Sequence, residues 1–351
     1  MIVTDFNPKH GRCSLIIESS EDLWTLRRLI SRGDVIVTRS SRVVKKEDEF
    51  SRPDKGERVG FSMALSVEVV TLDSSIERVR VRGTIMEASD ENVTKSGSHS
   101  VTISPGQSLT IRKNHWSALA IRLLRPTEGA STRFILVATD RRETGVGTLT
   151  GSHLAVLTTI ESGLGGKMFD EQSSKPYVSK VVSLVAQTYR EGDQIVVAGP
   201  GNSKSVVANQ LRQALNTPAT VVEGFDLTGS DGIRSMVKDP AFQQIAKGSV
   251  LVEMQKLVSE VVKRVSSGDS KVAYSLPRVR EAASAGAVDA CAVSDNVFST
   301  GVDEQELVDV LNTVEEKGGI VFLADSSLEF GKQVSAFGGI VSLLRYQVRA
   351  Y

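Results

Sequence analysis

A phosphate-binding loop is the first chemistry that the glycines and lysines of this chain suggest. Residues 199–205 follow an apolar run and place glycines and a Lys-Ser pair ahead of a helical pattern. A P-loop requires glycine directly before its lysine, and here Lys204 follows Ser203. We therefore interpret Pro200, Gly201 and Asn202 as a tight turn. Ser203 is then expected to cap the helix that follows.

Other catalytic groupings are sparse. The four histidines show no metal-ligand spacing, and we expect surface or structural roles for His10, His99, His115 and His153. Two cysteines, Cys13 and Cys291, are too few for a disulfide framework or a thiolate zinc site, so we expect them to pack in cores.

A run of alternating charges between residues 43 and 60 is the strongest binding candidate. Such a run cannot build a packed core, so we expect an exposed loop between two strands. One interpretation is a solvated hairpin. The other is a loop that contacts RNA through Lys45, Lys46, Arg52, Lys55 and Arg58 and is flanked by Arg39 and Arg42.

Length and composition limit the elements that can position these residues. A chain of 351 residues exceeds a single core, and two or three domains are expected. No apolar run is long enough to cross a membrane, and the first residues are too polar for a signal peptide, so we expect a cytoplasmic protein. Lys and Arg against Asp and Glu count 20 to 16 in residues 1–126, 13 to 13 in 127–257 and 9 to 13 in 258–351.

Residues 1–126 are expected to form a small curled sheet that tends to close into a barrel. β-Branched runs predict strands over 12–17, 34–44, 59–70, 76–85, 101–103 and 108–111. Arg78, Arg80 and Arg82 alternate with Val79 and Val81 in one of them. One helix is expected where Ser19 or Ser20 caps a first turn with Glu21 and Asp22.

The middle of the chain predicts an α/β arrangement around a glycine-rich loop, 162–167. Two apolar runs, 134–138 and 155–160, are expected to be adjacent strands with a turn-rich connection between them. A helix then follows, with a buried strand over 194–198 and a helix carrying Val207, Leu211 and Leu215.

This order of elements resembles the middle domain of the class 1 translation termination factors and of their paralogues, the archaeal Pelota family. The termination factors carry Gly-Gly-Gln in the loop, whereas this chain has Gly165, Gly166 and Lys167. A lysine cannot present the amide of glutamine, so hydrolysis of peptidyl-tRNA is not expected. Pelota proteins usually have Pro-Gly-Phe at the later turn, where this chain has Pro-Gly-Asn at 200–202.

The two ends of the chain support the same resemblance. The motif at 21–24 and the stretch at 81–84 look like the Sm-like amino-terminal domain of Pelota. Near the other end, Asp303 and Glu306 predict a capped helix, and strands are expected over 288–293, 320–323 and 340–344. This part resembles the carboxy-terminal domain shared with the termination factors, which has the fold of kink-turn-binding ribosomal proteins.

The resemblance implies a multidomain α+β protein. Its expected domains are an Sm-like β-barrel over 1–126, a release-factor-like α/β domain over 127–256 and an α/β sandwich over 257–351. The implied function is recognition of stalled ribosomes in the A site and their dissociation during no-go and non-stop messenger RNA decay. Implied partners are messenger and ribosomal RNA, a GTP-bound translational GTPase of the elongation-factor class and a recycling ABC-type ATPase. The protein is expected to be a monomer and to need no cofactor for recognition.

An alternative stays open because a divalent-metal-dependent endoribonuclease activity is attributed to the Pelota family. Whether the chain is an enzyme is therefore undecided from sequence. Glu21 and Asp22 are then weak candidates for holding the cation. Helix capping explains the same two residues more simply.

Overall fold

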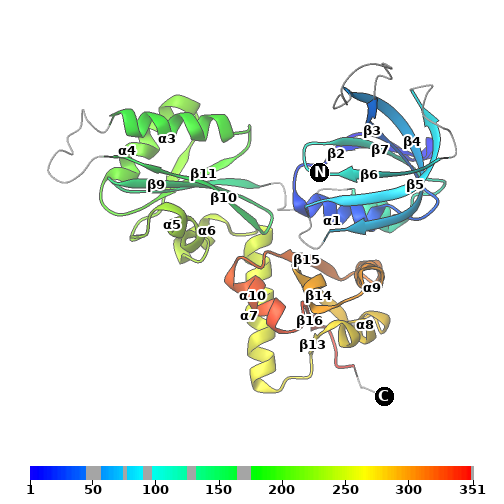
Figure 1. Ribbon diagram of the computed structural model, residues 1–351. Coiled ribbons are helices and arrows are strands. Elements are labelled where there is room, and N and C mark those ends of the chain that lie inside the picture. The colour runs from blue at the N-terminus through cyan, green and yellow to red at the C-terminus, as the bar shows by residue number, and fades with distance from the viewer. Residues whose placement is uncertain (45–56, 74–76, 90–96, 125–131, 164–174, 349–351) are drawn as a thin grey trace. The chain divides into compact units, whose positions relative to one another are not determined.

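This computed structural model describes residues 1–44, 57–73, 77–89, 97–124, 132–163 and 175–348, and its helices and strands are labelled in Figure 1. The chain divides into two compact units. One unit comprises Met1–Pro126 with Asp295–Gly318, and the other comprises Thr127–Ser294 with Gly319–Tyr351. Each of the three expected domain ranges contains one sheet of the described structure. The boundaries at 126 and 256 stay a prediction.

The first unit is built on a seven-stranded antiparallel sheet in the order β1-β2-β7-β3-β4-β5-β6. Its strands are β1 (Ile2–Asn7), β2 (Arg12–Ile16), β3 (Val35–Val44), β4 (Glu57–Leu72), β5 (Val79–Ala88), β6 (Ser98–Ile103) and β7 (Ser108–Arg112). Six of them are predicted from sequence. Strand β1 is missed because none of its side chains is buried, so it carries no hydrophobic alternation. A short 3-10 turn, η1 (Pro8–His10), follows it.

Helix α1 (Ser20–Leu29) begins at the predicted capping serine. The Ser19 hydroxyl accepts from the Asp22 amide, and the Asp22 carboxylate accepts from the Ser19 amide. Leu23 and Leu26 are fully buried where the helix packs against β4 and β5. A second short helix, α2 (Ala118–Leu123), contacts α1.

The first unit also contains η3 (Val297–Thr300) and α9 (Glu304–Glu316), which begins at the predicted cap, Asp303. Two buried arginines of α1 meet this segment. Arg27 forms an ion pair with Glu304, and the Arg28 guanidinium lies 2.6 Å from the Glu315 carboxylate. The apolar pattern of α1 does not predict this burial of charge, because the acidic partners lie more than 270 residues away in sequence.

The second unit begins with a five-stranded sheet in the order β10-β9-β8-β11-β12. Alternate residues of β8 and β11 face opposite sides, as a strand period of two requires. Ile135 and Val197 join a cluster with helices α3 and α4, whereas Phe134 and Val196 join a cluster with α5, α6 and α7. Burial on both faces explains why these strands are continuous apolar runs. The elements are β8 (Arg133–Thr139), β9 (Glu143–Thr150), β10 (His153–Glu161), α3 (Lys175–Thr188), β11 (Gln194–Ala198), α4 (Ser203–Leu215), β12 (Ala219–Val221), α5 (Gly229–Met236), α6 (Pro240–Ile245) and α7 (Val250–Ser267).

The expectation that runs 134–138 and 155–160 are adjacent strands is wrong, because β9 lies between β8 and β10. Its glycines mimic a turn-rich connection in the sequence. In the structure they let α5 approach the sheet: a Cβ on Gly145 would lie 2.1 Å from the Gly229 carbonyl oxygen, and one on Gly147 would lie 2.7 Å from an Ile233 methyl carbon.

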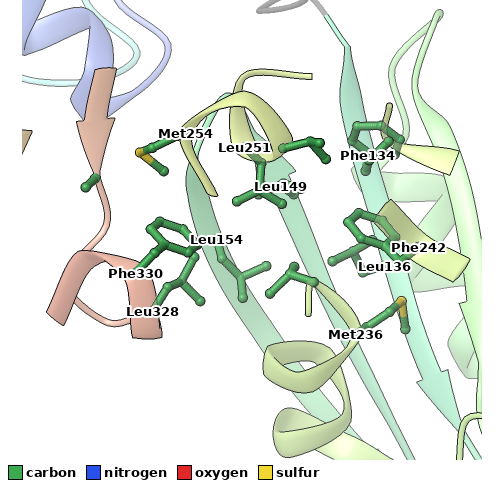
Figure 2. Close-up of a cluster of buried hydrophobic side chains, with 14 of the residues drawn as sticks. Phe134, Leu136, Leu149, Leu154, Met236, Phe242, Leu251, Met254, Leu328 and Phe330 are labelled. Carbon is green, nitrogen blue, oxygen red and sulfur yellow. The ribbon is translucent and has the colours of Figure 1, made fainter. Parts of the chain in front are cut away.

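A four-stranded sheet in the order β13-β16-β14-β15 completes the second unit. Its elements are β13 (Val272–Tyr274), α8 (Leu276–Ser284), β14 (Val288–Ser294), β15 (Ile320–Ala324), α10 (Glu329–Ala336) and β16 (Ile340–Leu344). Leu328 and Phe330 share a core with Leu154 of β10 and Met254 of α7 (Figure 2). Among the described residues, no helix has the length and apolar character to cross a membrane.

Candidate functional site

The predicted basic loop is carried by the hairpin of β3 and β4. Strand pairing continues through Arg42 opposite Val59 to Val44 opposite Glu57, so both arms lead directly into the segment 45–56. Arg39 is exposed on β3, opposite Ser62. Four of the predicted RNA contacts lie outside the described residues: Lys45, Lys46, Arg52 and Lys55.

The base of this hairpin is fixed by buried and polar contacts. Phe61 on β4 is 5% exposed and packs edge-on against His99 of β6, with ring centroids 6.3 Å apart. The Ser40 hydroxyl lies 3.1 Å from the His99 ring nitrogen. The expected structural role of this histidine is confirmed, because it contacts both β3, through Ser40, and β4, through Phe61.

Glu21 and Asp22 lie in the first turn of α1. The Asp22 carboxylate accepts from the backbone amides of Glu18 and Ser19, and the amino group of Met1 lies 2.6 Å away. Helix capping, the simpler of the two readings, is therefore observed for Asp22. Among the residues that the structure describes, no group of three or more His, Cys, Asp or Glu could hold a metal ion.

The glycine-rich loop leaves the end of the edge strand β10 and leads into α3. Gly163 has φ +67°, which favours glycine, and the Ser162 amide donates to the Arg142 carbonyl at 2.6 Å. Gly165, Gly166 and Lys167 lie outside the described residues.

A buried hydroxyl network anchors α3, the helix that follows the loop, and sequence analysis did not find it. The Tyr177 hydroxyl lies 2.6 Å from that of Thr144, which lies 2.6 Å from that of Thr139. Burial raises the pKa of Tyr177, with Asp140 and Glu143 acting in the same direction against its hydroxyl bonds to Thr144 and Thr139. The phenol thus stays protonated and ties the first turn of α3 to β8 and β9.

The turn at Pro200, Gly201 and Asn202 is confirmed as a turn, but its cap differs from the prediction. Ser203 is the first helical residue, and Asn202 holds the cap position without a side-chain hydrogen bond. Its backbone is already helical, and its carbonyl accepts from the amides of Ser205 and Val206. Lys204 is buried and lies 2.9 Å from the Glu223 carboxylate, so this ammonium has a carboxylate partner.

The remaining titratable candidates have structural surroundings. Both cysteines are fully buried, as predicted, and burial together with Asp5 raises the pKa of Cys13 to about 11. His153 Nδ1 lies 3.2 Å from the Asp325 carboxylate. Burial acts to raise the pKa of Asp325, but bonds from His153, Ser327 and the Leu154 amide outweigh it and lower the pKa.

Comparison with known proteins agrees with this architecture. Family models match residues 2–128 as Pelota N-terminal domain and residues 251–348 as eRF1 domain 3. A protein pelota homolog of Nitrosopumilus maritimus is 36% identical over 341 residues, which cover 96% of this chain and 97% of the relative. The chain belongs to the Pelota family. The predicted resemblance is confirmed, and with it the multidomain α+β fold.

One solved structure in particular has the same fold. The Thermoplasma acidophilum Pelota protein matches with a TM-score of 0.64 at 21% identity, covering 99% of this chain and 100% of that one. Another match, 26% identical with a TM-score of 0.46, covers 99% of this chain and 100% of that one and is described as a model of ribosome-bound archaeal Pelota and ABCE1. That description concerns the other protein and its complex.

Proposed function

We propose that this protein recognises stalled ribosomes in the A site and promotes their dissociation in messenger RNA surveillance, without hydrolysing peptidyl-tRNA. The observation that carries the proposal is the β3–β4 hairpin, whose paired arms place Arg39, Arg42 and Arg58 next to a charged segment that contains Lys45, Lys46, Arg52 and Lys55. Membership of the Pelota family supports a ribosomal target for this hairpin. The lysine at position 167, where termination factors have glutamine, supports the absence of peptide release.

The chemistry of such recognition is electrostatic. Each Lys or Arg that neutralises an RNA phosphate releases counterions, so binding weakens with salt in proportion to the number of contacts. The protein itself would break no bond. A GTP-bound translational GTPase and a recycling ABC-type ATPase are proposed as the partners that supply nucleotide hydrolysis, and the process would take place in the cytoplasm.

The test is subunit splitting of ribosomes stalled on a truncated messenger, with the GTPase and ATPase supplied. A variant with Lys45→Ala, Lys46→Ala and Arg58→Ala should lower the salt slope of ribosome binding by roughly two to three units, at about 0.7 to 0.9 per contact. Its splitting rate should fall, while thermal stability should change little because exposed charges contribute little to folding.

A matched control removes the same charge elsewhere in the first unit, through Lys9→Ala, Arg12→Ala and Arg32→Ala, three exposed residues. This control should bind and split ribosomes like the wild type. Normal splitting and an unaltered slope in the hairpin variant would show that the hairpin is only a solvated loop, against the proposal.

The endoribonuclease alternative gives a different result in the same preparation. RNA incubated with the protein and manganese would be cleaved, and a variant with Glu21→Gln and Asp22→Asn would lose cleavage while remaining folded. The Asn at position 22 keeps an oxygen that can accept the capping bond, so the helix is preserved. Cleavage lost in this way, without any splitting by the wild type, would favour the nuclease.

A further inference from the structure

Three arginines form a row on the outer face of the first sheet, away from the hairpin tip. Arg78 precedes β5 and Arg80 and Arg82 lie on it, all exposed, while the intervening Val79 and Val81 are fully buried. Residues two apart on a strand lie roughly 6.6 to 6.8 Å apart on the same face. Among the residues that the structure describes, none of these three guanidinium groups forms an ion pair.

Hydroxyl side chains flank the arginines on both neighbouring strands. Arg80 lies opposite Thr71 of β4 on one side and Thr102 of β6 on the other, and Arg82 lies opposite Ser100 of β6. All three hydroxyl residues are exposed. We call this surface the arginine face and define it by Arg78, Arg80, Arg82, Thr71, Ser100 and Thr102.

Three carboxylates lie near these arginines, and one of them, Glu77, is exposed next to Arg78. Glu68, in the bulge of β4, accepts from the Thr84 hydroxyl at 2.6 Å, and Asp73 accepts from the amides of Glu77 and Arg78. Arg80 and Arg82 lie opposite hydroxyl residues and Val69, not opposite carboxylates, so their guanidinium groups are open to an anion from solvent. The charge and the donors therefore complement an anionic partner.

We propose that the arginine face is a second RNA-binding surface, which contacts the sugar-phosphate backbone. Arginine, serine and threonine are the side chains that commonly donate to phosphate and sugar oxygens. A protein partner is the weaker fit, because the face has exposed Val69 beside Arg82 in place of an aromatic or broad apolar centre. The proposal deepens the proposed function and rests on it for the source of the RNA, which would be ribosomal or messenger RNA.

The arginine face and the hairpin lie at opposite ends of β4. Eleven residues separate Arg58, at the hairpin, from Val69, beside Arg82, which corresponds to about 35 Å along the strand. An RNA element bound at Arg58 would have to run along most of β4 to reach the arginine face as well. Two separate contacts would fix the orientation of the sheet on the RNA, whereas the hairpin alone would leave it free to pivot.

The experiment measures binding of the full chain to a fluorescein-labelled RNA duplex, and to a single strand of the same length, across a salt series. With Arg80→Ala and Arg82→Ala, the slope should fall by roughly 1.4 to 1.8 units, for two contacts at about 0.7 to 0.9 each. Over a tenfold rise in salt, the wild-type affinity should then drop roughly 25- to 60-fold more than that of the variant. Arg80→Lys with Arg82→Lys should restore the slope, because charge is kept, but should bind more weakly because the planar fork is lost.

The control variant, Lys9→Ala with Arg32→Ala, removes two exposed positive charges of the first unit that lie outside β5, and it should retain the wild-type slope. An unaltered slope in the Arg80 and Arg82 double variant, or a wild type that binds neither RNA, overturns the proposal. Loss of GTPase binding by that variant with RNA binding intact also overturns it and assigns the face to a protein.

Failure of the proposed function would give a different set of results from failure of the arginine-face proposal. If the wild type does not split stalled ribosomes, the proposed function fails, while the naked RNA measurement still decides the arginine face. If splitting is normal in the wild type and in the arginine variant and the RNA slope is unchanged, the function stands and the arginine face is wrong.

Discussion

The buried ion pair of Arg28 and Glu315 gives the sharpest stability prediction. Their side chains are 4% and 16% exposed, and the Arg28 Nε also donates to the Asn312 side-chain oxygen at 3.0 Å. Glu315→Ala would leave a guanidinium in the interior with one remaining acceptor. Loss of one partner of a buried pair costs about 3 to 5 kcal/mol, and we expect about 3 because Asn312 still accepts.

Substitution of the other partner, Arg28, should cost less free energy of unfolding. Arg28→Met removes the deeply buried charge and leaves Glu315, which water reaches more easily, so about 1 to 2 kcal/mol is expected. The double variant, Arg28→Met with Glu315→Leu, should be close to the wild type or more stable, since a buried pair can often be replaced by apolar side chains at no cost. With Glu315→Leu as the matching single variant, the double-mutant cycle should give a coupling energy well above 1 kcal/mol.

Tryptophan fluorescence during urea unfolding measures the loss of stability in the first unit, which contains the ion pair. The sequence has two tryptophans, and both Trp24 and Trp116 belong to the first unit. Trp24 is 4% exposed and packs against Phe298, so its emission should report loss of the contact between α1 and the η3–α9 segment. A loss of 3 kcal/mol lowers the urea midpoint by about 1 to 3 M at typical denaturant slopes. A midpoint within about 0.3 M of the wild type for Glu315→Ala would refute the reasoning.

Three further predictions concern the second unit. Gly145→Ala places a Cβ 2.1 Å from the Gly229 carbonyl oxygen, so it should destabilise by about 3 kcal/mol in thermal unfolding. Gly192→Ala meets no atom within 4 Å and should cost less, roughly 1 to 2 kcal/mol from the strain of its φ of +95°. Hydrogen bonds lower the pKa of Asp325 below the ordinary value of an aspartate, about 3.9. Its contribution to stability is therefore fully present above that ordinary value and is lost as pH falls through the lower folded pKa. Acid unfolding of Asp325→Asn, followed by circular dichroism, should show a flatter dependence below about pH 4. Finally, Lys167→Gln should not release peptide from programmed ribosomes, because release also needs the whole loop positioned at the ester bond. Peptide release by this variant would contradict the proposal that the middle domain has no release function.

Local signals in the sequence determined most of the elements. The cap at Ser19, the cap at Asp303 and the strand at 194–198 each depend on residues within a few positions of one another, and the structure has all three. The alternation of Arg80 and Arg82 with buried valines likewise predicts a strand with one charged face. For the hairpin, sequence predicted two strands around a charged segment, and the register from Val35 to Val44 confirms the pairing of its arms.

Tertiary structure decided what local pattern cannot encode, which is the identity of distant neighbours. The glycines of β9 are typical of turns in the sequence, and only the structure shows that α5 packs closely against them. Strand β1 is formed by its pairing with β2, although its side chains have no apolar pattern. Arg28 looks like a surface residue of a short helix, and only the approach of α9 explains its burial. The hydroxyls beside the arginines belong to β4 and β6, so only the register of three strands places them on one face. Contacts between residues distant in sequence form only when the chain closes the loop between them. The pattern of residues near one position therefore does not show which distant residues it will contact.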